Sequence, residues 1–239
     1  MTASSNSSST TFQSRDAQLI RQLIADTRPM KSIGERMKYV SARLLGLPYI
    51  ANPLIGSPNQ PEELVTRMDG FDCTTYLQTV LALALAKNLD EFTDKLCKIR
   101  YIDGDVDYRK RLHYTADWAQ YQTRRGLLVD LTLGEEMVVR EKTLSFLKGI
   151  EPKRILLRYY PKATLSSASR WLVDGDLIYF VSSRRDLDIF HVGLIFRNSQ
   201  QLVMRHARHK RERVIEQDLS EFFRRSQFSG FIINRPKDD

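Results

Sequence analysis

The hydrophobic residues of this 239-residue chain change their spacing part-way along the sequence. Up to about residue 100 they recur every three or four positions, which is typical of one face of a helix. After residue 177 they form short runs rich in branched and aromatic side chains, which is typical of antiparallel strands. Helices followed by a run of strands predict an α+β domain. The expected helices lie at 14–26, 33–45, 73–87, from 90 onward and at 218–225, and the expected strands at 177–181, 190–196, 202–206, 214–216 and 231–234.

Local signals mark where two of these helices begin. Ser32 and Glu35 have the spacing of a capping box. Asp72 is a good N-cap for the third helix, which is apolar on nearly every side after its first turn and is therefore expected to be buried. The segment 47–61 is rich in Pro, Gly and Asn, and 101–135 shows no clear period, so both are expected to be irregular.

Composition indicates one folded domain with a short extension. Hydrophobic residues make up 42% of the chain and charged residues 28%, which argues against a wholly disordered protein. The longest apolar run, around 80–86, is too short to cross a bilayer, so no transmembrane segment is expected. Residues 1–13 are rich in Ser and Thr. We expect a disordered tether at 1–13 and a single domain at 14–239.

The Ser-rich leader allows two interpretations of the compartment. It lacks the apolar stretch of a signal peptide, which fits a cytoplasmic protein. It also resembles the spacer between a lipid-anchored cysteine and a folded domain in bacterial envelope proteins. We favour the second interpretation, a protein of the cell envelope or periplasm whose native precursor carries a signal and a lipid tether.

The chain has a net charge of +8 and a sequence pI of about 9.5, which favours anionic partners. The densest basic stretch, 205–213, raises the alternative of nucleic-acid binding. We favour a solvated turn that attracts an anionic substrate, because no RNA-binding motif or helix-turn-helix accompanies it. Two cysteines are too few for a disulfide framework. Cys97 has helical spacing to neighbouring apolar residues and is expected to be a buried structural thiol.

Cys73 is the first candidate for chemistry, because it follows the N-cap at the start of a buried helix. The free N–H groups and the dipole of a helix start favour a thiolate, whereas the adjacent Asp72 carboxylate opposes it unless its side chain turns into the cap. A thiolate also needs a base that takes its proton and returns one to the leaving group. His191 lies inside a predicted strand, and His206 lies 15 residues later on the next one, so a hairpin can bring the two side by side.

These three residues have other interpretations. A single cysteine at a helix start is usually structural, and a histidine within a strand is more often a core or surface residue. One cysteine and two histidines are also a workable zinc ligand set, although their spacing matches no short zinc motif. The residues alone therefore favour a cysteine nucleophile without excluding the others.

Several ordered motifs resemble one family. The chain is similar to the NlpC/P60 cysteine peptidases, which are papain-like cell-wall amidases and endopeptidases, and in particular to the DUF1460 branch of N-acetylmuramoyl-L-alanine amidase-like proteins. The resemblance runs from about 46 to 233. It rests on Gly-Leu-Pro-Tyr at 46–49, Phe-Asp-Cys-Thr-Thr-Tyr at 71–76, Arg-Leu-His-Tyr-Thr-Ala-Asp-Trp at 111–118, Gly-Asp-Leu-Ile-Tyr-Phe at 175–180, His-Val-Gly-Leu at 191–194 and Arg-His-Ala at 205–207.

The resemblance implies a papain-like fold in which the catalytic helix packs on an antiparallel sheet. It implies that Cys73 is the nucleophile, His191 the general base and acid, and His206 the orienting residue. Tyr49 is implied to stand near the cysteine and to donate to the oxyanion, with Asp72 beside it. The implied substrates are peptidoglycan fragments, and the implied reaction is hydrolysis of the N-acetylmuramoyl–L-alanine amide without a metal or other cofactor.

We expect the stretch 108–118 to form a wall of the substrate site. Tyr114 or Trp118 can stack on a sugar ring, and Arg111 can pair with a peptide carboxylate. His113 and Asp117 are further candidates, with Asp117 binding a backbone or sugar hydroxyl. The alternative is that these residues only pack a long loop onto the core.

Two rival functions remain open at this point. The first is a peptidoglycan endopeptidase that cuts a D-glutamyl–diaminopimelate bond. The second is a non-catalytic basic module that binds nucleic acid or an anionic wall polymer. We favour the amidase, acting on muropeptides and not on nucleic acid.

Overall fold

The computed structural model describes residues 14–199 and 201–238, and the expected tether at 1–13 lies outside them. The helices are α1 (Ser14–Thr27), α2 (Ile33–Arg43), α3 (Cys73–Leu85), α4 (Leu89–Arg100), α5 (Thr115–Arg124), α6 (Leu165–Ala168) and α7 (Leu219–Arg225). The strands are β1 (Ile55–Ser57), β2 (Gln60–Glu63), β3 (Leu128–Asp130), β4 (Val138–Leu144), β5 (Lys153–Pro161), β6 (Leu177–Val181), β7 (Ile189–Asn198), β8 (Gln201–Arg208), β9 (Arg213–Asp218) and β10 (Gly230–Pro236).

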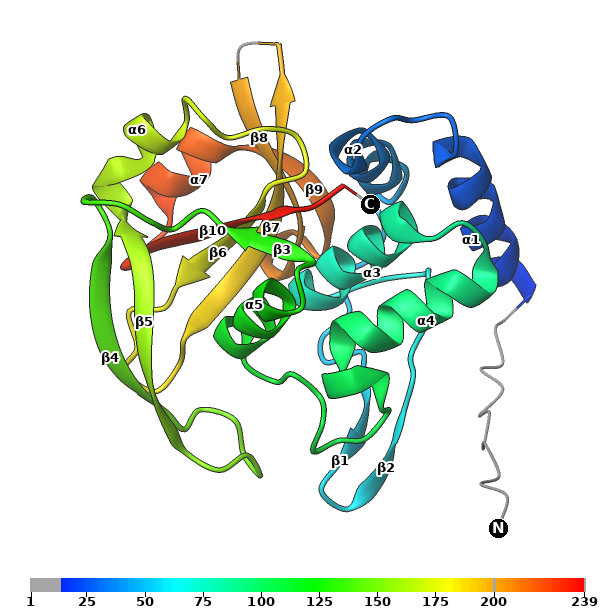
Figure 1. The fold of residues 1–239 in the computed structure, drawn as a ribbon, viewed down its shortest axis with the longest axis horizontal. Coiled ribbons are helices and arrows are strands. Elements are labelled where there is room, and N and C mark those ends of the chain that lie inside the picture. Colours follow the sequence, from blue (N-terminus) through cyan, green and yellow to red (C-terminus); the bar gives the residue numbers. More distant parts are fainter. Residues whose placement is uncertain (1–13, 200, 239) are drawn as a thin grey trace.

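An antiparallel sheet forms the centre of the fold. Its strand order is β4-β5-β10-β6-β7-β8-β9, and β3 pairs with β10. The run from β6 to β9 is the predicted meander, while β10, the last strand in the sequence, inserts between β5 and β6. Figure 1 shows α1 to α4 gathered on one side of the strands, with α6 and α7 on the other. The predicted α+β architecture, with a helix packed on an antiparallel sheet, is therefore confirmed.

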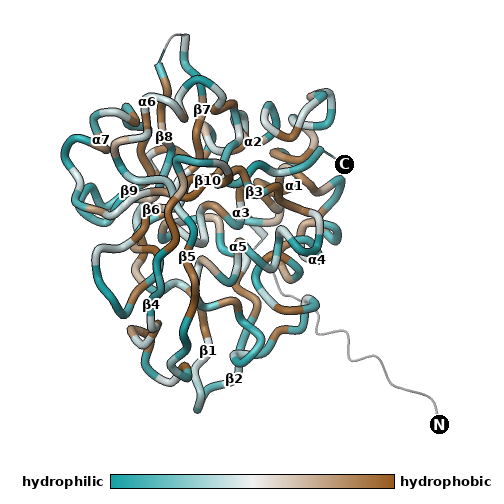
Figure 2. Tube along the Cα trace, turned by 60° about the vertical axis from the view of Figure 1, so that its left-hand side comes forward, coloured by the Kyte–Doolittle hydropathy of each residue, from teal (hydrophilic) through white to brown (hydrophobic). Residues whose placement is uncertain are grey.

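The two faces of the sheet bury different apolar clusters, because side chains alternate along each strand. On β7, Val192 and Leu194 join the larger cluster, which contains α3. Ile195 points the other way and joins the smaller cluster, together with Phe180 and Phe222 from α7. Figure 2 shows the hydrophobic stretches concentrated in the interior strands and α3, while the outer turns are hydrophilic.

The predicted helix starts are correct. Ser32 caps α2 in a complete capping box with Glu35. At α3 the Asp72 carboxylate accepts a hydrogen bond from the Thr75 backbone N–H at 2.7 Å, and the Asp72 N–H donates to the Thr75 hydroxyl at 3.0 Å. From Thr75 onward every residue of α3 is buried, as its apolar sequence predicted. This local signal fixes where the helix begins and places Cys73 in its first turn.

The expected irregularity of 101–135 is wrong, because α5 and β3 lie within it. The start of α5 has no local cap. Instead, the Asp188 carboxylate, 72 residues away, accepts a hydrogen bond from the Ala116 N–H at 2.7 Å. A cap supplied from so far along the chain leaves no sequence signal at the helix itself. The hairpin of β4 and β5 was likewise not predicted.

Three other expectations concern single features. Cys97 is half-buried and free, so it is less enclosed than expected, and Cys73 is also free. The basic stretch at 205–213 lies across the end of β8 and the turn into β9, as predicted. Across 14–199 and 201–238, no helix is both long and apolar enough to cross a membrane.

Candidate active site

Cys73 is the first residue of α3 and packs against the cluster on the α3 face of the sheet. Burial raises the pKa of its thiol to about 12, and the neighbouring Asp72 carboxylate adds to this effect. A hydrogen bond from the Val192 backbone acts in the opposite direction. The Asp72 side chain is turned into the cap, as expected, but it still raises the thiol pKa. Burial and Asp72 thus favour the neutral thiol, in opposition to the helix start.

The two predicted histidines meet across β7 and β8. His191 Nε2 lies 2.5 Å from His206 Nδ1, and the ring centroids are 4.7 Å apart. The Phe222 ring lies 5.7 Å from each imidazole, stacked on His191 and edge-on to His206. Phe180 stacks on His191 as well. The hairpin thus brings the pair together, and α7 covers it with an aromatic side chain.

Burial also keeps both imidazoles neutral. It lowers the pKa of His191 to about 3, and the positive charge of Arg208 contributes to this shift. The pKa of His206 is lowered well below its usual value by burial and by the charges of His191 and Arg208. A neutral imidazole is the form that can accept a proton from a thiol.

The cysteine and the histidine pair approach from opposite faces of the sheet. Cys73 lies on the α3 face, whereas His191 packs on aromatic residues of the α7 face. The Cys73 sulfur contacts the backbone of Val192, the residue directly after His191, beyond the end of the β7–β8 pairing at Leu194. Among the described residues, no hydrogen bond joins this sulfur to either imidazole. His206 engages Nε2 of His191, so Nδ1 is the ring nitrogen of His191 that makes no contact with His206.

Tyr49 lies in the neighbourhood of the cysteine. An isolated bridge pairs it with Phe71, two residues before Cys73. Burial raises the pKa of its hydroxyl to about 12, with contributions from the charges of Cys73 and Asp72. The edge-to-face contact of its ring with His209 has a centroid distance of 5.2 Å. The Tyr49 hydroxyl is therefore a protonated donor in the neighbourhood of the thiol.

The predicted substrate wall is mostly engaged within the protein. The half-buried His113 has its Nε2 2.7 Å from the Tyr108 carbonyl oxygen. Tyr114 is 2% exposed, and its hydroxyl accepts a hydrogen bond from the Leu147 N–H at 3.3 Å. This burial leaves no face of its ring free for the expected stacking on a sugar. Asp117 forms an ion pair with Lys153.

Two further expectations for this wall are wrong. Trp118 is 3% exposed and its indole N–H donates to the Ile99 carbonyl, so its ring cannot stack on a sugar. The Arg111 guanidinium is paired with the buried carboxylate of Glu62 at 2.7 Å, so it is not free for a peptide carboxylate. Both residues are used to hold the 101–135 segment onto the rest of the fold.

Sequence reasoning missed several neighbours of the histidine pair. Phe222 covers both rings, and Arg208 and Gln217 act on the pKa of His206. Only the register of β9 against β8 brings Gln217 to the face that carries His206. The alternation of apolar residues in 213–218 was the one available signal, and it did not reveal which polar group faces the imidazole.

The zinc alternative finds no support in the geometry. Within 14–199 and 201–238, no group of three or more His, Cys, Asp or Glu side chains is arranged to hold a metal ion.

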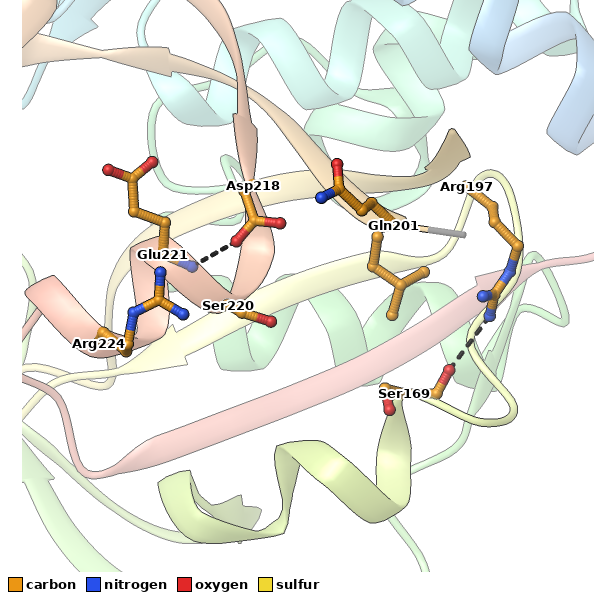
Figure 3. Close-up of a pocket in the computed structure, with 8 residues that line it drawn as sticks. Ser169, Arg197, Gln201, Asp218, Ser220, Glu221 and Arg224 are labelled. Carbon is orange, nitrogen blue, oxygen red and sulfur yellow. Dashed lines mark hydrogen bonds between the residues drawn. The ribbon is translucent and has the colours of Figure 1, made fainter. Parts of the chain in front are cut away.

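A separate surface pocket opens between α6 and α7 (Figure 3), and it contains none of the predicted site residues. The residues that line it are Ser169, Arg197, Gln201, Leu202, Asp218, Ser220, Glu221 and Arg224.

Comparison with known proteins places the chain in a family. The model of the AmiA-like, or N-acetylmuramoyl-L-alanine amidase-like, family matches residues 39–231. The chain belongs to this family. No curated protein matches it. The family assignment confirms the resemblance identified from the sequence motifs and supports an amidase-like hydrolase related to peptidoglycan.

Solved structures agree with this assignment. An N-acetylmuramoyl-L-alanine amidase from Bacteroides uniformis is 30% identical, with a TM-score of 0.76, over 86% of this chain and 99% of its own. A second structure of an amidase with the same description and source is 29% identical over the same shares, also with a TM-score of 0.76. A Legionella pneumophila protein of the DUF1460 family superposes with a TM-score of 0.82 over 94% of this chain and 95% of its own. At 24% identity, that last likeness shows the fold alone.

Proposed function

We propose that this protein hydrolyses the N-acetylmuramoyl–L-alanine amide bond of muropeptides, with Cys73 as the nucleophile. The proposal is supported by the histidine pair, whose ring nitrogens lie 2.5 Å apart, and by the contact of the Cys73 sulfur with the backbone of Val192, the residue after His191. The amidase-like family and the Bacteroides uniformis amidases supply the substrate class.

The first step is a general-base attack. Because the thiol and the imidazoles are neutral at rest, the Cys73 proton passes to Nδ1 of His191 as the sulfur adds to the lactyl carbonyl carbon of the muramic acid. The carbonyl oxygen gains negative charge in this step. The backbone N–H of Cys73 at the helix start and the Tyr49 hydroxyl are the donors proposed for this oxyanion.

The second half of the reaction regenerates the enzyme. The imidazolium of His191 gives its proton to the nitrogen of alanine as the C–N bond breaks, which leaves a thioester on Cys73 and a free stem peptide. Water then loses a proton to His191 and adds to the thioester carbonyl. The C–S bond breaks, the sulfur regains the proton from His191, and N-acetylmuramic acid leaves with a free carboxyl group.

The test is digestion of purified muropeptides by the wild-type protein and by Cys73→Ala, with products identified by mass spectrometry. We expect the wild type to release an intact stem peptide beginning with L-alanine, and the variant to release none. Cys97→Ala is the matched control, because it removes the other free thiol, on α4. Equal activity of Cys73→Ala and wild type would refute the cysteine mechanism.

The same digest tests the rival peptide bond. A dipeptide of L-alanine and D-glutamate left on the sugar would identify an endopeptidase with the same cysteine chemistry. Absence of any cleavage by the wild type, together with retained binding of fragments, would indicate a binding module instead.

A further inference from the structure

We propose that Gln217 is a positioning residue of this site, and that it fixes the tautomers of both histidines by accepting a hydrogen bond from Nε2–H of His206. The inference rests on the proposed function for its catalytic consequence. Its structural part concerns which nitrogen of each imidazole carries a proton, and that part can be tested without activity.

The bond between the histidines can be made in two ways. If His191 Nε2 carries the shared proton, His191 Nδ1 is a free lone pair that can accept the thiol proton. If His206 Nδ1 carries it instead, neutral His191 is protonated at Nδ1 and cannot act as the base. A neutral imidazole has one N–H, so the productive arrangement requires His206 to be protonated at Nε2.

The surroundings of His206 Nε2 therefore decide between the two arrangements. This atom is buried, and no hydrogen bond joins it to any of the described residues. An acceptor in front of it selects the productive tautomer, whereas a donor selects the unproductive one. A buried N–H without an acceptor costs free energy, so the identity of the facing group has consequences.

Gln217 is placed to be that group. On β9, Ile215 is the direct partner of His206 and Gln217 pairs with Met204, so Gln217 is the diagonal neighbour of His206 on the same face of the sheet. Its side chain acts on the His206 imidazole in the direction that raises the imidazole pKa, which is the effect of a nearby acceptor. The groups acting on His206 are His191 from β7, Arg208 from β8 and Gln217 from β9, while α7 presents the apolar ring of Phe222.

Arg208 determines which end of the amide is available. Its Nη1 donates to Gln217 Oε1 at 2.5 Å. A guanidinium has only donors, so it holds the oxygen rather than the NH₂ group at this position. An amide oxygen has two lone pairs, and the second remains for His206 Nε2–H. Arg208 thereby orients the acceptor that sets the tautomer of His206 and, through it, that of His191.

The experiment compares Gln217→Leu, which removes the acceptor, with Gln217→Glu, which keeps one. Gln217 and Arg208 line an open cleft, so both substitutions have space. Gln201→Leu, at the far end of β8, is the matched control. The imidazole nitrogens of His191 and His206 are followed by ¹⁵N NMR at neutral pH, and kcat and KM are measured on the same proteins.

We expect the wild-type spectrum to show both histidines protonated at Nε2. Gln217→Leu should lose this pattern and lower kcat about 10- to 100-fold with little change in KM, the range known for groups that orient metal-bound histidines. Gln217→Glu should keep most of kcat. Its negative charge should also move the acid limb of the kcat/KM profile to higher pH. Gln201→Leu should match the wild type.

Two results would overturn the proposal. One is a wild-type spectrum with His206 protonated at Nδ1, and the other is a Gln217→Leu protein whose spectrum and kcat equal those of the wild type. Failure of the proposed function looks different, because an inactive wild type or an active Cys73→Ala leaves the NMR result for Gln217 intact. The two ideas can therefore fail separately.

Discussion

The cysteine and the histidine pair are held in contrasting ways. Cys73 is positioned by its immediate neighbours, since Asp72 and Thr75 cap the helix that it begins. His191 and His206 are positioned by strand pairing and by Phe222, which lies in a different element far along the sequence. One half of the site depends on a local sequence signal and the other on long-range packing.

This difference has a chemical consequence. Cys73 and His191 are half-buried and His206 is buried, and the loss of solvent moves the thiol pKa up and the imidazole pKa values down. The two groups are thus kept neutral by the same physical cause, acting from opposite faces of one sheet. In the proposed mechanism, proton transfer from the thiol to His191 therefore accompanies the attack on the substrate.

The largest effect is expected from removing the base on the long-range side. His191→Asn should lower kcat/KM about 10²- to 10⁴-fold, because general-base catalysis is lost while the cysteine stays in its capped helix. Turnover of muropeptides measures this, and circular dichroism checks the fold. Retention of wild-type turnover would show that the thiol does not need His191 as a general base.

A smaller loss is expected on the cysteine side. Tyr49→Phe removes a hydroxyl beside the thiol without changing the ring that contacts His209. We expect kcat to fall about 10²-fold, as when one oxyanion donor is removed. If only KM rises, Tyr49 binds substrate in the ground state and does not stabilise the oxyanion.

Lowering the pH should reduce the stability of the fold through the histidines before it affects the cysteine. In the folded protein the pKa of His191 is about 3, below its ordinary value of 6.5, so the unfolded chain binds the proton more tightly. The free energy of unfolding therefore falls as the pH drops from 6.5 towards 3. Between pH 7.5 and 5, His191 alone should remove about 2 kcal/mol from the free energy of unfolding. Urea titrations at both pH values measure this, and His191→Asn should show a smaller loss. An equal loss in the variant would assign the acid sensitivity to other groups.

The smallest effect concerns the local cap. Asp72→Ala should lower the free energy of unfolding by about 1 kcal/mol, whereas Asp72→Asn keeps a capping side chain and most of that stability. Both variants remove the charge that raises the Cys73 pKa, so both should react faster with iodoacetamide at pH 8. A thiol that reacts no faster in either variant would show that burial alone sets its pKa.

The parts of the fold that were predicted correctly are those with short-range signals. The capping residues Ser32 and Asp72, the apolar run of α3 and the alternating strands from β6 to β9 could all be identified within a few residues. The start of α5 could not, because its cap is Asp188. The roles of Arg111 and Trp118 could not be predicted either, because their partners Glu62 and Ile99 are distant in sequence.

By itself, the sequence determined that a cysteine would begin a buried helix and that two histidines would lie on neighbouring strands, because caps and side-chain alternation are local properties. The tertiary structure decided that these groups approach from opposite faces of the sheet, that they are neutral, and that Arg208 and Gln217 stand behind His206. Protonation depends on desolvation and on charges brought close by folding. The protonation states of these groups therefore cannot be assigned until the strands that carry them are in register.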